Sequence, residues 1–272
     1  MTKAKRLERV VALALELVSR PTHLFSFGKF CDQFDVAKST LSEDVQAIKN
    51  GVALFGLGEV ETVAGAAGGV RFVPGCKKTE EKAFLLALAE RLMEPERVIP
   101  GGFLYMSDLL FEPYIVSRLG EIFRRHFADC RPDYILTVET KGIPLALMTA
   151  RSFDVPLVMA RRGSRVTEGS AVSINYVTGS ARRIQTMSLP RRALPAGARV
   201  LIIDDFMKAG GSAKGLCDLA SEVGAQVVGT GVLIATCEPE EKMLSDYLTL
   251  LELDVLNEQS RVTRIHPVNC SE

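Results

Sequence analysis

The sequence predicts a chain of two folded parts: an N-terminal helix-turn-helix with a β-hairpin wing, and a larger C-terminal α/β part whose mostly parallel sheet is covered by helices on both faces. Three observations lead to this fold class. Helical spacing dominates residues 3–50, and a small-residue hairpin follows. The composition changes at residues 73–78, which read Val-Pro-Gly-Cys-Lys-Lys. Beyond that point short apolar strands alternate with helices, which is typical of a parallel sheet.

Composition places the chain among globular proteins. It has 272 residues, of which 47% are apolar and 24% charged, with a net charge of zero, so a disordered or fibrous chain is excluded. Glu16 interrupts the apolar stretch near the N-terminus, which therefore predicts an amphipathic helix and not a secretory signal. No later stretch approaches the ~18 uncharged apolar residues of a membrane span. We expect a cytoplasmic protein with no membrane partner.

Cysteine and histidine spacing predicts no metal site and no thiol chemistry. The six cysteines lie far apart without a Cys-x-x-Cys pair, and the three histidines are scattered. Zinc sites that can be recognised in a sequence depend on such close spacing. We interpret the cysteines as small, reduced core residues.

Three helices are expected in the first part. They cover residues 3–19, 26–34 and 38–50, with Ser26 capping the second and Gly51 ending the third. A three-residue turn joins the second helix to the third, which predicts a helix-turn-helix. The apolar face of the first helix is expected to comprise Leu7, Val10, Val11, Ala14, Leu17 and Val18.

A β-hairpin completes the first part, with strands at residues 59–63 and 70–73 on either side of a small-residue tip. A helix-turn-helix with such a hairpin is a winged helix, and its third helix would read DNA. Hydroxyl and basic side chains gather at the start of that helix, and basic ones at the start of the chain. The expected DNA contacts are Lys3, Lys5, Arg6, Lys38, Ser39, Thr40 and Ser42, with Arg9 adding to the basic N-terminus.

The charge of this part leaves an alternative open. Residues 1–76 carry nine basic and eight acidic side chains, a net charge of +1, which is small for a part that binds nucleic acid. Serine and threonine at the start of a helix are also ordinary caps. A three-helix interaction domain without a nucleic-acid role is the alternative interpretation.

Four strands are expected in the second part, at residues 134–138, 155–160, 200–203 and 227–234, after a helix at about 79–93. Apolar strands separated by helices predict a parallel sheet that is buried on both faces. Right-handed crossovers bring the carboxyl ends of such strands to one edge. Any ligand site is expected along that edge.

The strongest functional signal is at residues 200–212, where an apolar strand ends in two carboxylates and a glycine-containing loop opens a helix. The Asp204-Asp205 pair could accept hydrogen bonds from the vicinal hydroxyls of a sugar. The Gly210-Gly211 pair would let backbone N–H groups close around a phosphate, and Ser212 adds a hydroxyl donor. The spacing differs from the Walker loop and from the dinucleotide fingerprint. The segment therefore predicts a ribose 5-phosphate site.

This segment resembles the diphosphoribosyl-binding motif of the type I phosphoribosyltransferases, and the resemblance implies the fold of that family. It assigns residues 139–142 to a diphosphate loop, Arg161-Arg162 to a basic diphosphate contact, and residues 163–190 to a flexible loop over the site. One departure is Ala209, which stands where the transferases usually carry threonine and removes one hydroxyl donor. Phe206 and Tyr105 could supply an aromatic face near the site, and the alternative is that either is a core residue. The candidate ligand-binding residues are Tyr105, Thr140, Lys141, Gly142, Arg161, Arg162, Asp204, Asp205, Phe206, Lys208, Ala209, Gly210, Gly211 and Ser212.

Both parts together look like the purine operon repressors of Gram-positive bacteria, a winged helix fused to a phosphoribosyltransferase-like domain. The resemblance rests on residues 38–44, 140–146, 166–180 and 183–188 together with the acidic loop. It implies a homodimer that binds double-stranded operator DNA, represses purine biosynthesis genes and is released by 5-phosphoribosyl 1-diphosphate. It also implies no required cofactor and no catalysis, with Mg²⁺ as a companion of the effector and guanosine tetraphosphate as a competitor for its site.

The same resemblance divides the chain into two domains. Residues 1–74 would form the winged-helix DNA-binding domain, and residues 75–272 the effector-binding domain. An alternative is a catalytically active purine or orotate phosphoribosyltransferase with an appended N-terminal domain. The acidic loop fits both functions, but an enzyme would not need hydroxyl and basic side chains on an exposed helix. A third interpretation, an assembly module with a vestigial site, predicts neither ligand nor DNA binding.

Overall fold

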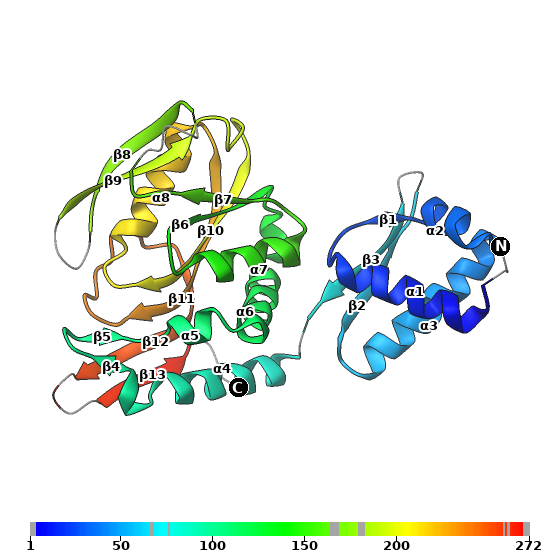
Figure 1. The fold of residues 1–272 in the computed structure, drawn as a ribbon, viewed down its shortest axis with the longest axis horizontal. Helices are drawn as coiled ribbons and strands as arrows, with labels where there is room; N and C mark the ends of the chain where they lie inside the picture. The colour runs from blue at the N-terminus through cyan, green and yellow to red at the C-terminus, as the bar shows by residue number, and fades with distance from the viewer. Residues whose placement is uncertain are drawn as a thin grey trace. The chain divides into compact units, whose positions relative to one another are not determined.

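A computed structural model of the protein describes residues 4–65, 68–75, 77–163, 169–178, 183–257, 259 and 262–268. The chain forms two compact units. The first comprises Met1–Lys77 with Arg151–Asp154, and the second Lys78–Ala150 with Val155–Glu272. Figure 1 draws residues 1–77 in blue to cyan and most of the second unit in green to red. Within the part of the chain described, no helix combines the length and apolar character needed to cross a membrane.

Three helices form most of the first unit: α1 (Arg6–Ser19), α2 (Phe27–Phe34) and α3 (Lys38–Leu54). Ser26 caps α2, because its Oγ accepts a hydrogen bond from the Lys29 amide at 3.3 Å. Asp35 has a left-handed φ of 51° and turns the chain from α2 toward α3. The predicted cap and helix-turn-helix are therefore confirmed.

The third helix is longer than the sequence predicts. α3 continues past Gly51 to Leu54, so the prediction that Gly51 ends the helix is wrong. Gly51 is not among the residues with a positive φ, and a Cβ there would meet no atom within 4 Å, so nothing at this position ends the helix. Glycine inside a helix costs only about 1 kcal/mol relative to alanine, which neighbouring packing outweighs. The left-handed turn comes later, at Gly56 with a φ of 65°.

The buried face of α1 also differs from the predicted one. Arg9, Leu13 and Leu17 are its buried residues. Of the six residues expected on that face, three are exposed: Leu7, Val11 and Val18, with exposed fractions of 76%, 52% and 47%. The helix is turned so that Arg9 points into the unit, where a carboxylate of α3 pairs with it.

The wing consists of β2 (Gly58–Val63) and β3 (Gly69–Pro74), and the short β1 (Phe25–Ser26) pairs with β3 on its other side. All pairings are antiparallel. The predicted wing strands are confirmed, and with the three helices they make a winged helix. Its core contains Leu13, Leu17, Phe25, Phe30, Leu41, Val45, Ile48, Val60, Val70 and Phe72.

A six-stranded sheet organises the second unit, with the order β13-β12-β11-β10-β6-β7. Its neighbours are parallel except for the antiparallel pair β12–β13. The four strands that the sequence predicts are present as β6, β7, β10 and β11, whereas β12 and β13 were not predicted. The bounds are β6 (Tyr134–Val138), β7 (Leu157–Ala160), β10 (Arg199–Met207), β11 (Gln226–Thr236), β12 (Leu248–Asn257) and β13 (Val262–Pro267).

Helices cover both faces of this sheet, as predicted (Figure 1). On one face α6 packs so closely that a Cβ at Gly231 of β11 would lie 2.8 Å from the Phe123 ring. On the other face Leu216 and Leu219 of α8 pack with Ile202 of β10. The helices of this unit are α4 (Lys78–Leu92), which matches the helix expected at about 79–93, α5 (Ser107–Leu110), α6 (Pro113–His126), α7 (Ile143–Phe153) and α8 (Gly211–Glu222), with 3-10 turns η1 (Pro95–Arg97) and η2 (Ala128–Cys130).

Two hairpins complete the unit: β4 (Val98–Ile99) with β5 (Phe103–Leu104), and β8 (Ala171–Val177) with β9 (Ile184–Pro190). The second hairpin lies in residues 163–190, which were expected to be a flexible loop. That expectation is wrong for the strands, because Val172 and Met187 are buried in the core beside α8. Residues 164–168 and 179–182 of the same segment lie outside the described residues.

Candidate functional site

Two adjacent carboxylates stand at the carboxyl end of β10. Asp204 is buried and Asp205 is half-buried, and the Asp205 amide donates a hydrogen bond to Asp204 Oδ1 at 3.0 Å. Burial raises the pKa of Asp204 well above its usual range, and the charge of Asp205 raises it further. Burial also raises the pKa of Asp205. The fold therefore holds acidic oxygen atoms in a position where hydroxyl donors of a ligand would relieve their desolvation.

The loop between β6 and α7 lies against this pair. A Cβ at Gly142 would come within 2.9 Å of both Asp204 Oδ1 and Thr137 Oγ1, so only glycine allows this approach. Thr137 Oγ1 is buried and has no hydrogen-bond partner among the described residues. Lys141 is exposed, and its charge lowers the pKa of Asp205. Residues 140–142 are thus brought beside the acidic pair.

Arginines at the end of β7 supply further positive charge. Burial raises the pKa of both Asp204 and Asp205, and the positive charge of Arg162 offsets part of that rise. The Arg162 amide donates to Glu139 Oε1 at 2.7 Å, and Arg161 Nη1 lies 3.7 Å from Glu139 Oε2. Glu139, the first residue of the predicted diphosphate loop, therefore links that loop to the two arginines. Lysine and arginine beside a carboxylate pair suit a ligand that carries both hydroxyl and phosphate groups.

The loop after the acidic pair opens α8. Gly210 has a left-handed φ of 80° and is the N-cap of the helix. The first N–H groups of a helix have no partner inside it, so those at Gly211 and Ser212 are available to a phosphate. Residues 208–212 thereby follow the acidic pair in the order that the sequence predicts, with Lys208 exposed and Ser212 half-buried.

A segment far along the chain supports this loop from behind. The Met243 amide donates to the Ala209 carbonyl at 2.8 Å. Thr236 Oγ1 lies 3.2 Å from the Lys208 carbonyl, although its single proton has a closer acceptor in the Glu238 carbonyl at 2.6 Å. A Cβ at Gly210 would lie 3.3 Å from the Leu244 amide nitrogen. Sequence reasoning did not identify residues 236–244 because nothing in their composition signals a contact with a loop 28 or more residues earlier.

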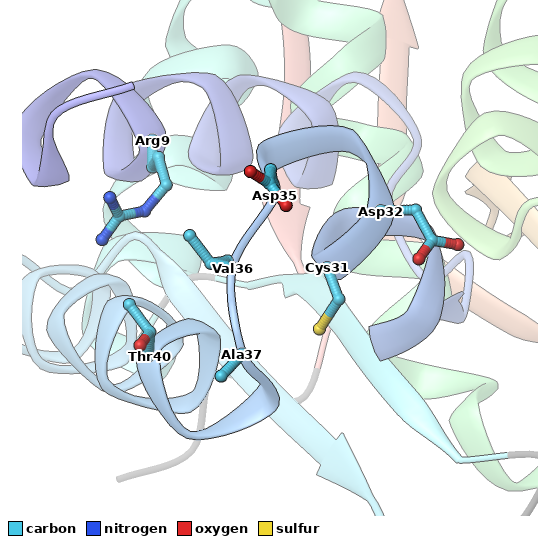
Figure 2. Close-up of a pocket in the computed structure, with 7 residues that line it drawn as sticks. All are labelled: Arg9, Cys31, Asp32, Asp35, Val36, Ala37 and Thr40. Carbon is cyan, nitrogen blue, oxygen red and sulfur yellow. The ribbon is translucent and has the colours of Figure 1, made fainter. Parts of the chain in front are cut away.

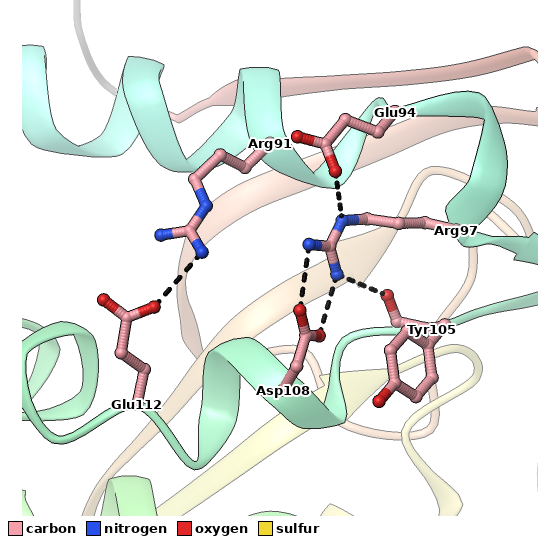
Figure 3. Close-up of polar contacts among 6 residues, drawn as sticks. All are labelled: Arg91, Glu94, Arg97, Tyr105, Asp108 and Glu112. Atoms are coloured by element: carbon pink, nitrogen blue, oxygen red, sulfur yellow. Dashed lines mark hydrogen bonds and ion pairs between the residues drawn. The ribbon is translucent and has the colours of Figure 1, made fainter.

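The two aromatic candidates have different settings. Phe206 is half-buried on β10, whereas the Tyr105 side chain is 44% exposed. Figure 3 shows that the Tyr105 backbone is fixed by Arg97, which donates to its carbonyl at 3.2 Å and to both oxygens of Asp108 at 2.8 and 3.0 Å. The hydrogen bond with Arg97 lowers the pKa of Asp108. Arg97 also donates to Glu94 Oε2 at 3.1 Å, and nearby Arg91 pairs with Glu112 at the same distance.

The candidate DNA-reading residues lie at the start of α3. Lys38, Ser39 and Ser42 are exposed and Thr40 is half-buried, while Leu41, Val45 and Ile48 face the core. The Ser42 hydroxyl donates to the Lys38 carbonyl at 2.9 Å. Gln46 and Asn50 share the exposed face and bond to each other at 2.8 Å, although neither was predicted as a site residue. Their amides are groups that can read base edges.

A hollow of ≈ 640 Å³ lies between α1 and the turn that precedes α3. Figure 2 shows the side chains of Asp32 and Asp35 at its rim. Carboxylates repel phosphate, so we expect a nucleic-acid backbone to contact the Lys38 side of α3 and not this hollow. Its lining residues are Arg9, Cys31, Asp32, Asp35, Val36, Ala37 and Thr40.

The basic N-terminus differs from the sequence expectation at Arg9. Its exposed fraction is 7%, and its Nε donates to Asp44 Oδ2 at 2.8 Å, so Arg9 is a structural residue and the expectation that it adds to a DNA-facing surface is wrong. Arg6 has an exposed side chain (63%) and Lys5 is exposed as well. Lys3 lies outside the described residues.

Comparison with known proteins agrees with this two-part organisation. The family described as "Bacterial purine repressor, N-terminal" matches residues 5–74, and the phosphoribosyl transferase domain family matches residues 108–262. The chain is 43% identical to the purine biosynthesis transcriptional repressor PurR of Bacillus subtilis over 98% of this chain and 94% of that protein. It is 36% identical to the purine biosynthesis transcriptional activator PurR of Lactococcus lactis, over 94% and 95%.

The fold of the second unit is that of solved transferases. The adenine phosphoribosyltransferase of Thermoanaerobacter pseudethanolicus superposes with a TM-score of 0.54 at 18% sequence identity. The superposition covers 61% of this chain and 99% of the transferase. The predicted fold class, a winged helix followed by a type I phosphoribosyltransferase fold, is therefore confirmed.

Proposed function

The chain belongs to the bacterial purine repressor family, and from that premise we propose that it represses purine biosynthesis genes and is released from operator DNA by 5-phosphoribosyl 1-diphosphate. Residues 1–74 would bind the DNA and residues 75–272 the effector, in a homodimer. The observation that carries the proposal is the Asp204–Asp205 pair at the end of β10, with the Gly142 loop, Arg162 and the start of α8 around it. Relatives bear the names of both repressors and activators, so the sign of regulation is part of what we propose.

Each part of the site has a role toward the effector. Asp204 and Asp205 accept the ribose hydroxyls, and residues 208–212 bind the 5-phosphate. The diphosphate meets residues 140–142 and Arg161-Arg162, whose charges complement it. Carboxylate oxygens are ligands that Mg²⁺ accepts, so Mg²⁺ bound to the diphosphate fits beside the acidic pair. Guanosine tetraphosphate carries the same kind of diphosphate groups, so it would compete with the effector for the basic side chains of this site.

We place the DNA contact on the exposed start of α3. Lys38→Glu is expected to weaken binding to specific and non-specific duplex alike, by about tenfold at 0.1 M salt, since a phosphate contact carries no sequence information. The slope of affinity against salt should fall by about 1. Fluorescence anisotropy over a salt titration measures both quantities. Lys214→Glu, an equal charge change on the exposed side of α8, is the control and should leave DNA affinity unchanged. Equal losses in the two variants would contradict the placement.

Ligand and DNA are expected to oppose each other. An allosteric coupling of about 1–3 kcal/mol means that saturating effector raises the operator dissociation constant roughly tenfold or more. The ligand's charge would neutralise basic side chains that otherwise contribute to a DNA-facing surface, such as the exposed Arg183, Arg191 and Arg192. Arg165 and Arg182, expected to act in the same way, lie outside the described residues. Linkage requires that operator DNA weaken effector binding by the same factor. Titrating both arms tests the proposal, and an unchanged or tighter operator complex would refute the inducer role.

The alternative function is an active purine or orotate phosphoribosyltransferase. The second unit has that fold, so only an assay distinguishes the two functions. We propose that the effector binds without turnover. Release of diphosphate at ordinary enzymatic rates with adenine, guanine, xanthine or orotate would favour the enzyme instead.

A further inference from the structure

A cluster of four different side chains occupies one face of the sheet edge formed by β11, β12 and β13. Glu252 and Asp254 lie on β12, and although the register shifts between Leu253 and Val255, carboxylate oxygens of the two residues come within 4.8 Å of each other. His266 of β13 is the antiparallel partner of Glu252. Cys237 follows β11 and donates its amide to the Leu253 carbonyl, which sets it beside Asp254. The register of three strands therefore gathers a thiol, two carboxylates and an imidazole.

Distances within this cluster suit one small metal ion. The ligand atoms of Cys237, Glu252 and Asp254 all lie within 4.8 Å of one another. His266 is not a member of this group, but it contacts both carboxylates, with Nδ1 3.3 Å from Asp254 Oδ2 and Nε2 3.6 Å from Glu252 Oε2. Tetrahedral zinc with bonds of about 2.0–2.3 Å keeps its ligand atoms roughly 3.3–3.8 Å apart. The three residues of the first group are half-buried, so an ion has access.

The positively charged groups around the cluster do not fully neutralise its two carboxylates. The ion pairs of Glu252 and Asp254 among the described residues are with His266, which is charged only when protonated. Lys242 is nearby, but its Nζ donates to the carbonyls of Thr236 and Pro239, both at 2.6 Å. The Cys237 thiol lies 2.7 Å from Asp254 Oδ1, and this hydrogen bond, followed by burial, raises the pKa of Cys237 to about 12.

We propose that Cys237, Glu252 and Asp254 form a binding site for a divalent transition-metal ion of the zinc type, with His266 paired to the two carboxylates beside it. Thiolate, imidazole and carboxylate are the donors that zinc takes in proteins. On binding, the metal–sulfur bond replaces the S–H bond, and the proton leaves to solvent. The short contact between the thiol and Asp254 opens as that proton departs. The site does not depend on the proposed regulatory function, since it is defined by these residues alone.

Occupancy would act on the phosphate loop of residues 208–212. Cys237 directly follows Thr236, whose Oγ1 lies 3.2 Å from the Lys208 carbonyl, and the same segment continues to Met243, whose amide donates to the Ala209 carbonyl at 2.8 Å. A metal that fixes Cys237 to β12 and β13 fixes the start of the segment that supports this loop. We expect zinc to slow amide hydrogen exchange in residues 237–247 and at Gly210 and Gly211. Unchanged exchange in zinc-loaded protein would refute this coupling.

Cobalt(II) gives a direct test of the metal site, because a cysteine thiolate bound to it produces a charge-transfer absorption band. The full-length wild-type chain, stripped with chelator, should bind one Co²⁺ per chain with this band, and Zn²⁺ should displace it. Cys237→Ser should abolish the band, while Cys217→Ser, at a half-buried cysteine of α8, should retain it. Asp254→Asn should weaken Zn²⁺ binding at least tenfold. A band that is missing in the wild type, or unchanged in Cys237→Ser, would overturn the proposal.

Discussion

Asp44→Ala is expected to lower the free energy of unfolding of the first unit by about 3–5 kcal/mol, because it leaves a buried guanidinium without its counter-charge. Asp44 is fully buried, and Arg9, with an exposed fraction of 7%, donates to it at 2.8 Å. After the substitution Arg9 would keep only its bond to the Ala4 carbonyl at 2.9 Å. A unit of this size has a stability of only about 4–12 kcal/mol, so the loss would unfold an appreciable fraction of it.

Two controls separate this pair from ordinary surface ion pairs. The double variant Arg9→Met, Asp44→Leu removes both charges and should recover most of the stability, since apolar residues can replace a buried pair. Glu16→Ala breaks the exposed pair with Lys29 and should cost less than about 1 kcal/mol. Hydrogen exchange of the α1 and α3 amides in the full chain reports the unit's stability. If Asp44→Ala and Glu16→Ala lower the stability equally, the buried pair contributes no more to it than the exposed pair does.

The sequence pattern was sufficient to predict an element where the residues of that element alone determine its structure. β6 and β10 lie in the middle of the sheet with both faces covered, so they read as continuous apolar runs and were recognised. Ser26 correctly predicted the start of α2, because an N-cap bonds to an amide only three residues further along the chain. The acidic loop was likewise predictable, since its carboxylates, glycines and helix start follow one another directly along the chain.

Features that depend on two distant segments escaped prediction. Arg9 on the buried face of α1 becomes intelligible only with Asp44, which comes 35 residues later. That missing partner is why Leu7 and Val11 were assigned to the core. β12 carries Glu252 and Asp254 on one side and was not recognised, and with β13 it forms an edge where charge is tolerated. The support of the phosphate loop by residues 236–244 is a long-range contact of the same kind.

The second large effect concerns the effector. Asp205→Ala should weaken binding of 5-phosphoribosyl 1-diphosphate by about 1–3 kcal/mol for each hydroxyl that loses its acceptor, which is roughly 5- to 150-fold per bond. Isothermal titration calorimetry measures the loss. Asp218→Ala, which removes an exposed carboxylate of α8 paired with Lys214, is the matched control and should bind as the wild type does. Wild-type affinity in Asp205→Ala would refute the assignment of the acidic pair to the ribose.

Asp204→Asn should produce opposite changes in stability and in affinity. Burial raises the pKa of Asp204 in the folded state above its unfolded value, so the fold favours the protonated form. The stability of the wild type therefore falls as the pH rises from the unfolded pKa toward and through the folded one, so the charge of Asp204 lowers stability at neutral pH relative to acid pH. Asparagine cannot ionise, and its Oδ1 can still accept the Asp205 amide. The variant should consequently unfold at higher urea concentration than the wild type at pH 7, with a difference that disappears near pH 3, while its effector affinity drops. A variant less stable at pH 7 would mean that the buried carboxylate carries no such cost, and that the acidic pair is held in place for a reason other than ligand binding.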